Sequence, residues 1–126
     1  MTPLIILAAA TTVLDCSDPQ TQAEMTMCAA QDYRAADKEL NQQWPKTVAV
    51  MKEKDTYPQP AYDKGPSYNA ALLASQRAWL VYRDAQCLAD GYSARGGTMQ
   101  PMLVYGCKAR LTEERVKQLK TMADVN

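Results

Sequence analysis

The chain has 126 residues, 14 acidic and 14 basic side chains, and no histidine. This length suits one domain with a modest core, and the zero formal charge argues against nucleic acid as the main partner, because phosphate binding relies on a basic excess. The absence of histidine removes Ser-His and Cys-His catalytic pairs and imidazole metal sites. Residues 1–63 carry 9 acidic and 5 basic side chains and residues 64–126 carry the reverse, so the first half could present an acidic face to a cationic protein.

The N-terminus contains an apolar run, Leu4–Ala10, with the length of the apolar segment of a signal peptide. No Lys or Arg precedes this run, and it is too short to cross a membrane. Four cysteines in a small chain also indicate an oxidising compartment. We therefore expect residues 1–14 to be a signal-peptide remnant or a disordered N-terminus, residues 15–126 to form a single helical domain, and the protein to be periplasmic or secreted, with no transmembrane segment.

The first helix is expected from about Gln20 to Lys54, where apolar side chains recur with a period of 3.6 residues. Pro45 should kink this helix or divide it into two shorter helices, because proline lacks the backbone donor that the helix needs. Prolines and glycines between Asp55 and Ser67 predict a loop.

The second helix is expected to begin after Ser67 as its cap and to reach about Asp90, with Leu73 and Leu80 on its buried face and Gly91 in the left-handed position that ends it. Beyond a mobile turn at residues 96–97, a third helix could be capped by residue 98 and could be broken near residue 112. No alternating strand pattern is present. The predicted fold is all-α, an antiparallel three-helix bundle with long connections, stapled by disulfides.

The four cysteines are Cys16, Cys28, Cys87 and Cys107. They include no C-x-x-C pair, which disfavours a zinc site, and we expect neither a metal nor a cofactor. The favoured pairing is Cys16–Cys28 and Cys87–Cys107, the second of which would clamp the glycine-containing connection between the last two helices. Four cysteines allow three pairings, and a bond between Cys28 and Cys87 stays open, because antiparallel helices would place these residues at similar heights.

The segment Ser75–Cys87 places Gln76 and Arg83 on the apolar face of the second helix. A buried guanidinium needs a partner, since an unpaired buried charge costs several kcal/mol. Asp37 and Asn41, four residues apart among the apolar positions of the first helix, are the candidates. We predict that Asp37, Asn41, Gln76 and Arg83 form a buried polar network, structural rather than catalytic, that fixes how the two helices pack.

Several segments together resemble the LprI-like lysozyme-inhibitor family. The likeness spans nearly all of the chain after residue 14, and its most specific part is the Arg-Asp-x-x-Cys element with Gln-Arg-Ala-Trp upstream. The resemblance implies a small, helical, disulfide-containing bacterial protein that is exported, and a lysozyme or another peptidoglycan hydrolase as its partner. The segments that carry the resemblance are Thr21–Met25, Cys28–Ala29, Ser75–Trp79, Tyr82–Cys87 and Gly96–Thr98, with Cys16, Tyr33, Asp37, Leu40, Asn41, Cys107, Thr112, Arg115 and Leu119.

An inhibitor of this kind needs a rigid surface that covers a cleft with two catalytic carboxylates. The segment Gly91–Thr98 is the candidate, because Tyr92 and Arg95 are residue types that often dominate binding and a disulfide at its base would hold it in shape. The alternative interpretation is that its glycines only make the turn.

The sequence can be compared with two other classes of function, an enzyme and an interaction module. An enzyme would have to use a pair such as Asp37 and Asp84, which no further carboxylate joins in the sequence, so we expect no enzymatic activity. An exported structural or interaction module of the cell envelope, without inhibitory activity, fits the same sequence. Tyr57, Tyr62 and Tyr68 could then form a recognition surface or pack onto the helices.

Overall fold

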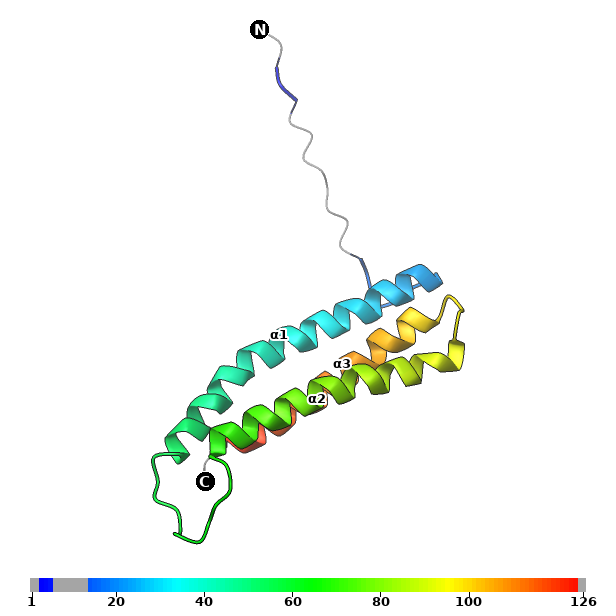
Figure 1. The fold of residues 1–126 in the computed structure, drawn as a ribbon. Coiled ribbons are helices and arrows are strands. Elements are labelled where there is room, and N and C mark those ends of the chain that lie inside the picture. The colour runs from blue at the N-terminus through cyan, green and yellow to red at the C-terminus, as the bar shows by residue number, and fades with distance from the viewer. Residues whose placement is uncertain (1–2, 6–13, 125–126) are drawn as a thin grey trace.

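A computed structural model describes residues 3–5 and 14–124, and within them the chain folds as three long helices without strands. Neighbouring helices in the sequence run antiparallel, so the bundle is elongated, with the 55–67 loop at one end and the 92–99 connection at the other (Figure 1). The predicted all-α, antiparallel three-helix bundle with long connections is confirmed. The predicted signal-peptide remnant lies mostly outside the described residues. The elements are α1 (Gln22–Lys54), α2 (Tyr68–Gly91), the short 3-10 helix η1 (Tyr92–Ala94) and α3 (Gln100–Ala123).

The first helix begins at a side-chain cap and continues past its proline. The hydroxyl of Thr21 accepts a hydrogen bond from the backbone N–H of Glu24 at 3.1 Å, while the Glu24 carboxylate accepts one from the backbone N–H of Gln20 at 2.7 Å. The first contact satisfies one of the free donors of the first helical turn, and the second holds the chain just before the cap. Pro45 lies inside one uninterrupted helix with its ring exposed, so the expected division into two helices is wrong. The packing of α1 along α3 offsets the hydrogen bond that proline removes.

Two acceptors hold the start of α2. The Ser67 hydroxyl accepts a hydrogen bond from the Ala70 N–H at 3.0 Å, as the sequence predicted, and the Asp55 carboxylate accepts from the N–H groups of Tyr68 at 2.6 Å and Asn69 at 3.1 Å. A carboxylate at this position also interacts favourably with the positive end of the helix dipole. Because Asp55 directly follows α1, these bonds join the end of the first helix to the start of the second.

Gly91 ends α2 for a reason that the sequence did not reveal. Its φ is −65°, in the right-handed region, so the expected left-handed conformation is wrong. A Cβ added at Gly91 would lie only 2.5 Å from Cγ2 of Val104 in α3. The glycine therefore permits close approach of two helices, and the left-handed conformation belongs to Gly96, with φ of +78°.

The third helix differs from its prediction in its N-terminal cap and in its continuity. Thr98 does not cap it, and Met99, which precedes the first helical residue, makes no side-chain capping bond. The helix is also unbroken at Gly106 and Thr112. Thr112 is fully buried, and this packing outweighs its low helix propensity.

Large apolar side chains and disulfides stabilise opposite halves of the bundle. The core cluster of Leu40, Met51, Leu72, Val116 and Leu119, which Trp44 and Trp79 flank, lies in the half nearer the 55–67 loop. In the other half the disulfides Cys16–Cys28 and Cys87–Cys107 join Cα atoms 5.6 and 5.4 Å apart, which confirms the favoured pairing.

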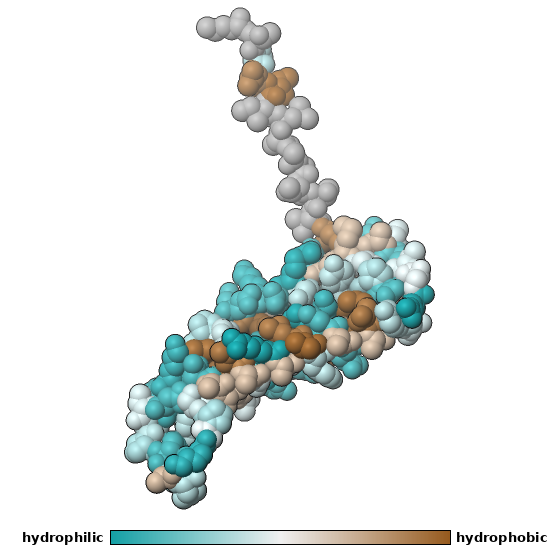
Figure 2. All heavy atoms as spheres, in the orientation of Figure 1, coloured by the Kyte–Doolittle hydropathy of each residue, from teal (hydrophilic) through white to brown (hydrophobic). Residues whose placement is uncertain are grey.

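No described helix is long and apolar enough to span a membrane. Figure 2 shows hydrophobic residues between hydrophilic ones along the surface of the bundle.

Two glycine substitutions test the account of the α2–α3 contact. Gly91→Ala should lower the free energy of unfolding by about 1–3 kcal/mol, because the added methyl group meets the stiff Val104 side chain. Gly106→Ala is the matched control in α3: its added Cβ meets no atom within 4 Å, so we expect a gain of about 0.5–1 kcal/mol from helix propensity. Urea unfolding of both oxidised variants measures the difference, and equal effects of the two would contradict the close approach.

Candidate functional site

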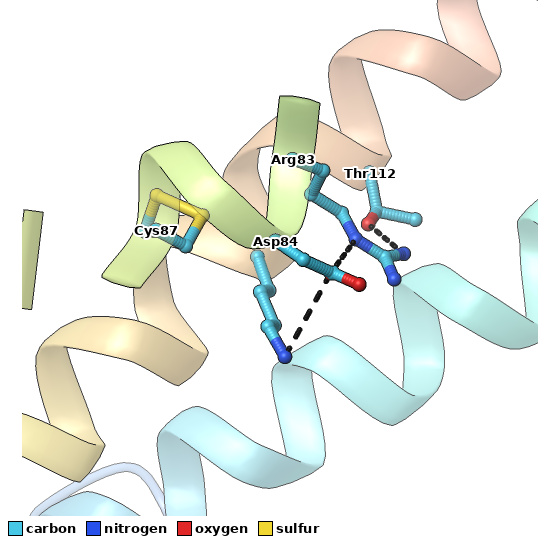
Figure 3. A network of polar contacts seen from close by, with 6 residues as sticks. Arg83, Asp84, Cys87 and Thr112 are labelled. Atoms are coloured by element: carbon cyan, nitrogen blue, oxygen red, sulfur yellow. Dashed lines mark hydrogen bonds and ion pairs between the residues drawn. A yellow bond between two sulfur atoms is a disulfide. The ribbon is translucent and has the colours of Figure 1, made fainter. Parts of the chain in front are cut away.

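Arg83 reaches from α2 into the interior of the bundle (Figure 3). Its Nε donates to Oδ1 of Asp84 at 3.0 Å and its Nη1 donates to the Thr112 hydroxyl of α3 at 3.4 Å. The guanidinium carbon lies 5.3 Å from the ring centre of Tyr33 and 5.2 Å from that of Trp79. Burial raises the pKa of the Tyr33 hydroxyl, and the nearby Arg83 charge opposes this rise. The arginine is therefore paired, hydrogen-bonded and enclosed by two aromatic rings.

A second buried arginine belongs to α3. Arg115 donates from Nε to the Gln76 side-chain oxygen at 2.9 Å, from Nη2 to the Ser75 hydroxyl at 2.8 Å, and from Nη1 to Gln118 at 3.1 Å. Its guanidinium carbon is 5.8 Å from the ring centre of Trp79. Burial lowers the pKa of Arg115. Trp79 is thus close to two guanidinium groups, one from its own helix and one from α3.

The predicted network of Asp37, Asn41, Gln76 and Arg83 is assembled differently in the structure. Gln76 and Arg83 are buried as expected, but their hydrogen-bond partners on other helices belong to α3, whereas Asn41 is exposed and Asp37 half-buried on α1. Neither Asp37 nor Asn41 hydrogen-bonds to Gln76 or Arg83. The physical reason is that α1 packs mainly on α3, so the polar face of α2 meets α3. Arg115 was missed as a partner, although it lies four residues before Leu119 on the buried face of its helix.

The buried polar groups of α2 and α3 are hydrogen-bonded to one another. In the described part of the chain every fully buried side-chain nitrogen or oxygen has a hydrogen-bond partner, and no cluster of three Cys, Asp or Glu side chains could hold a metal ion. Asp84 is half-exposed and binds Arg83 and, at 3.8 Å, Lys108. A satisfied network of this kind fixes the packing of α2 on α3.

The 91–98 segment is a braced loop that brings Tyr92 and Arg95 together. The Arg95 guanidinium carbon lies 4.4 Å from the Tyr92 ring centre, a stacking distance, and both side chains are exposed. The Arg95 N–H donates to the Tyr92 carbonyl at 3.1 Å, and the Gly96 N–H donates to the Gln100 side chain at 2.9 Å. The Cys87–Cys107 disulfide joins the two helices at the base of this loop. The segment therefore offers a pre-shaped pair of contact residues.

The 55–67 loop forms a second exposed surface at the opposite end of the bundle. Tyr57, Tyr62 and Tyr68 are all exposed, with 86% of Tyr62 accessible. Tyr57 contacts Glu53 of α1 and Lys54 lies over the ring of Tyr68, so two of the three also contact the end of α1. A hollow of about 530 Å³ lies between this loop and the start of α2, and its lining includes Tyr57, Tyr68, Asp55 and Asp63. The Asp55 carboxylate already accepts hydrogen bonds at the N-terminus of α2. It is therefore less available to a ligand in this hollow than an unpaired carboxylate would be.

The acidic and basic halves of the sequence are interleaved in space. α1 carries five acidic and five basic side chains and packs along the basic α3, and Glu39 of α1 forms an ion pair with Lys120 of α3 at 2.9 Å. Opposite charges lie next to one another, so the first half of the chain presents a weaker acidic field than its sequence predicts. The expected attraction of a cationic protein to that half is correspondingly weaker.

Known proteins resemble this chain in sequence and in fold. The family model described as "Lysozyme inhibitor LprI" matches residues 15–119. An uncharacterized protein of Rhizobium meliloti (strain 1021), R02472, is 45% identical over 113 residues, which cover 87% of this chain and 79% of that relative. The crystal structure of a DUF1311 family protein from Pseudomonas putida KT2440 has a TM-score of 0.68 and 20% identity, over 86% of this chain and 100% of that one. The likeness to the Pseudomonas putida structure shows a shared fold.

Removing the Arg83 charge should destabilise the protein without altering the 91–98 loop. Arg83→Met keeps most of the aliphatic stem but loses both hydrogen bonds, so the free energy of unfolding should fall by about 1.5–3 kcal/mol. Arg34→Met removes an exposed arginine of α1 and should change it by less than about 0.5 kcal/mol. Urea unfolding provides the measurement. A stable Arg83→Met variant that loses a binding activity would instead indicate a direct functional role for this arginine.

Proposed function

This chain belongs to the lysozyme inhibitor LprI family, and we propose that it is an exported protein that binds a lysozyme or another peptidoglycan hydrolase and inhibits it. The family match extends over residues 15–119 and so includes all three helices and both disulfides. Two disulfides in a chain of this size suit an oxidising compartment outside the cytoplasm, where such hydrolases act. The family description supports the class of partner, and the chain's own surface supports the place of contact.

We assign the contact to the 91–98 loop, and the stacked pair of Tyr92 and Arg95 is the observation that carries this assignment. Tyrosine and arginine are enriched among residues that contribute most to protein binding. Two backbone or side-chain hydrogen bonds and a disulfide at its base already order the loop. Such a loop loses little conformational entropy on binding, so more of its contact energy becomes affinity.

The chemistry of Arg95 suits the cleft of a lysozyme. Cleavage of a glycosidic bond depends on two carboxyl groups on either side of the scissile bond, and a guanidinium can bind a carboxylate through two parallel hydrogen bonds. Arg95 takes part in none of the ion pairs found among the described residues, so its charge is available to a partner. Tyr92 would keep the guanidinium oriented and cover the cleft with its ring.

Alanine substitutions in this loop test the proposal. The oxidised protein should slow the clearing of a peptidoglycan suspension by lysozyme, and Tyr92→Ala and Arg95→Ala should each weaken inhibition by about tenfold or more, as expected of hot-spot residues. Tyr62→Ala is the matched control, because this tyrosine is exposed on the loop at the other end of the bundle, and it should inhibit like the unchanged protein. Circular dichroism checks that all three variants stay folded.

The same assay separates the alternatives. No inhibition of any of several lysozyme types would overturn the proposal and favour an exported interaction module of the cell envelope. If Tyr62→Ala abolishes inhibition and Tyr92→Ala leaves it unchanged, the contact belongs to the 55–67 loop. That result would refute the assignment to Tyr92 and Arg95.

A further inference from the structure

One long face of α2 is apolar and is not covered by any other described element. Leu73, Leu80, Val81 and Leu88 are 37%, 38%, 72% and 47% exposed. At 100° per residue these four side chains fall within an arc of about 100° beside the buried face of the helix. The expectation that Leu73 and Leu80 are buried is therefore wrong for the isolated chain. We call this set of four residues the α2 stripe.

Two opposite charges lie within the arc of the α2 stripe. They are Arg77 and Asp84. Arg77 is exposed and belongs to none of the ion pairs found among the described residues. Both ion-pair contacts of Asp84 use Oδ1, which leaves Oδ2 available for another donor.

The order of these residues is complementary to itself when the helix direction is reversed. With a two-fold axis between positions 80 and 81, Leu73 faces Leu88, Arg77 faces Asp84, and Leu80 faces Val81. An isologous interface requires this property, because each residue i that contacts j is matched by j contacting i.

We propose that the α2 stripe is a homodimer interface, in which α2 packs antiparallel against α2 of a second copy of this chain. Burial of the four apolar side chains provides the driving force, and two symmetric Arg77–Asp84 pairs fix the register. The parallel arrangement is disfavoured, because it would place Arg77 against Arg77 and Asp84 against Asp84. The antiparallel axis leaves the two 91–98 loops at opposite ends of the dimer, so the interface is independent of the proposed inhibitory contact.

Single introduced cysteines test the register of this dimer. All four natural cysteines are in disulfides, so Leu73→Cys or Leu88→Cys adds one reactive thiol. Residues 73 and 88 are about 22 Å apart along one helix, so neither variant should cross-link to itself, whereas a mixture of both should form a covalent dimer under mild oxidation. Ala78→Cys, about 60° beyond the edge of the arc that the α2 stripe occupies, is the control and should not cross-link with Leu88→Cys. Stronger cross-linking of Leu73→Cys alone than of the mixture would refute the antiparallel arrangement.

Sedimentation equilibrium tests association without cross-linking. The mass of the unchanged protein should rise with concentration from that of one copy to that of two. Val81→Glu should stay at the mass of one copy, and it should fold normally because Val81 is mostly exposed. The control Ala78→Glu, which adds the same charge outside the α2 stripe, should associate like the unchanged protein. A constant mass of one copy for the unchanged protein overturns the proposal. Loss of lysozyme binding in Val81→Glu together with a monomeric unchanged protein would assign the α2 stripe to a different partner and also overturn it.

Discussion

The bundle depends on how α2 is held against the other two helices. The core cluster receives a single buried apolar side chain from α2, Leu72, which is little for a helix of 24 residues. Two arginines near one indole ring replace the missing apolar contact. Arg83 and Arg115 both lie close to Trp79, and each makes side-chain hydrogen bonds. Such contacts are directional, so they fix the rotation of α2 about its axis more narrowly than apolar packing does.

The distribution of stabilising interactions along the bundle follows from side-chain size. Large apolar residues fill one half, whereas the other half buries small ones such as Ala30, Ala36 and Ala109. Small side chains bury little apolar area, so this half gains little from the hydrophobic effect. Both disulfides lie there, and they stabilise by restricting the unfolded chain rather than by adding contacts. The 91–98 loop is thus anchored where packing alone would anchor it least.

Much of the fold could be predicted from the sequence because helices leave local signals. Apolar periodicity, the Ser67 cap and the prolines of the first connection determined the three helices within a few residues of their observed ends. The partners of Arg83 could not be predicted in the same way. A periodic pattern shows which face of a helix is buried, but not which of two neighbouring helices covers it. Likewise, the requirement for Gly91 arises from Val104 in another helix, and nothing near Gly91 in the sequence indicates it.

The disulfide between Cys87 and Cys107 encloses the exposed 91–98 loop in a covalent ring. A protease that cuts one peptide bond inside this ring leaves α2 and α3 joined through the two sulfur atoms. The chain ends created by such a cut stay tethered next to each other at the tip of the bundle. The exposed loop can therefore be nicked in a protease-rich compartment without release of the third helix, and the cut becomes visible as two fragments only after reduction.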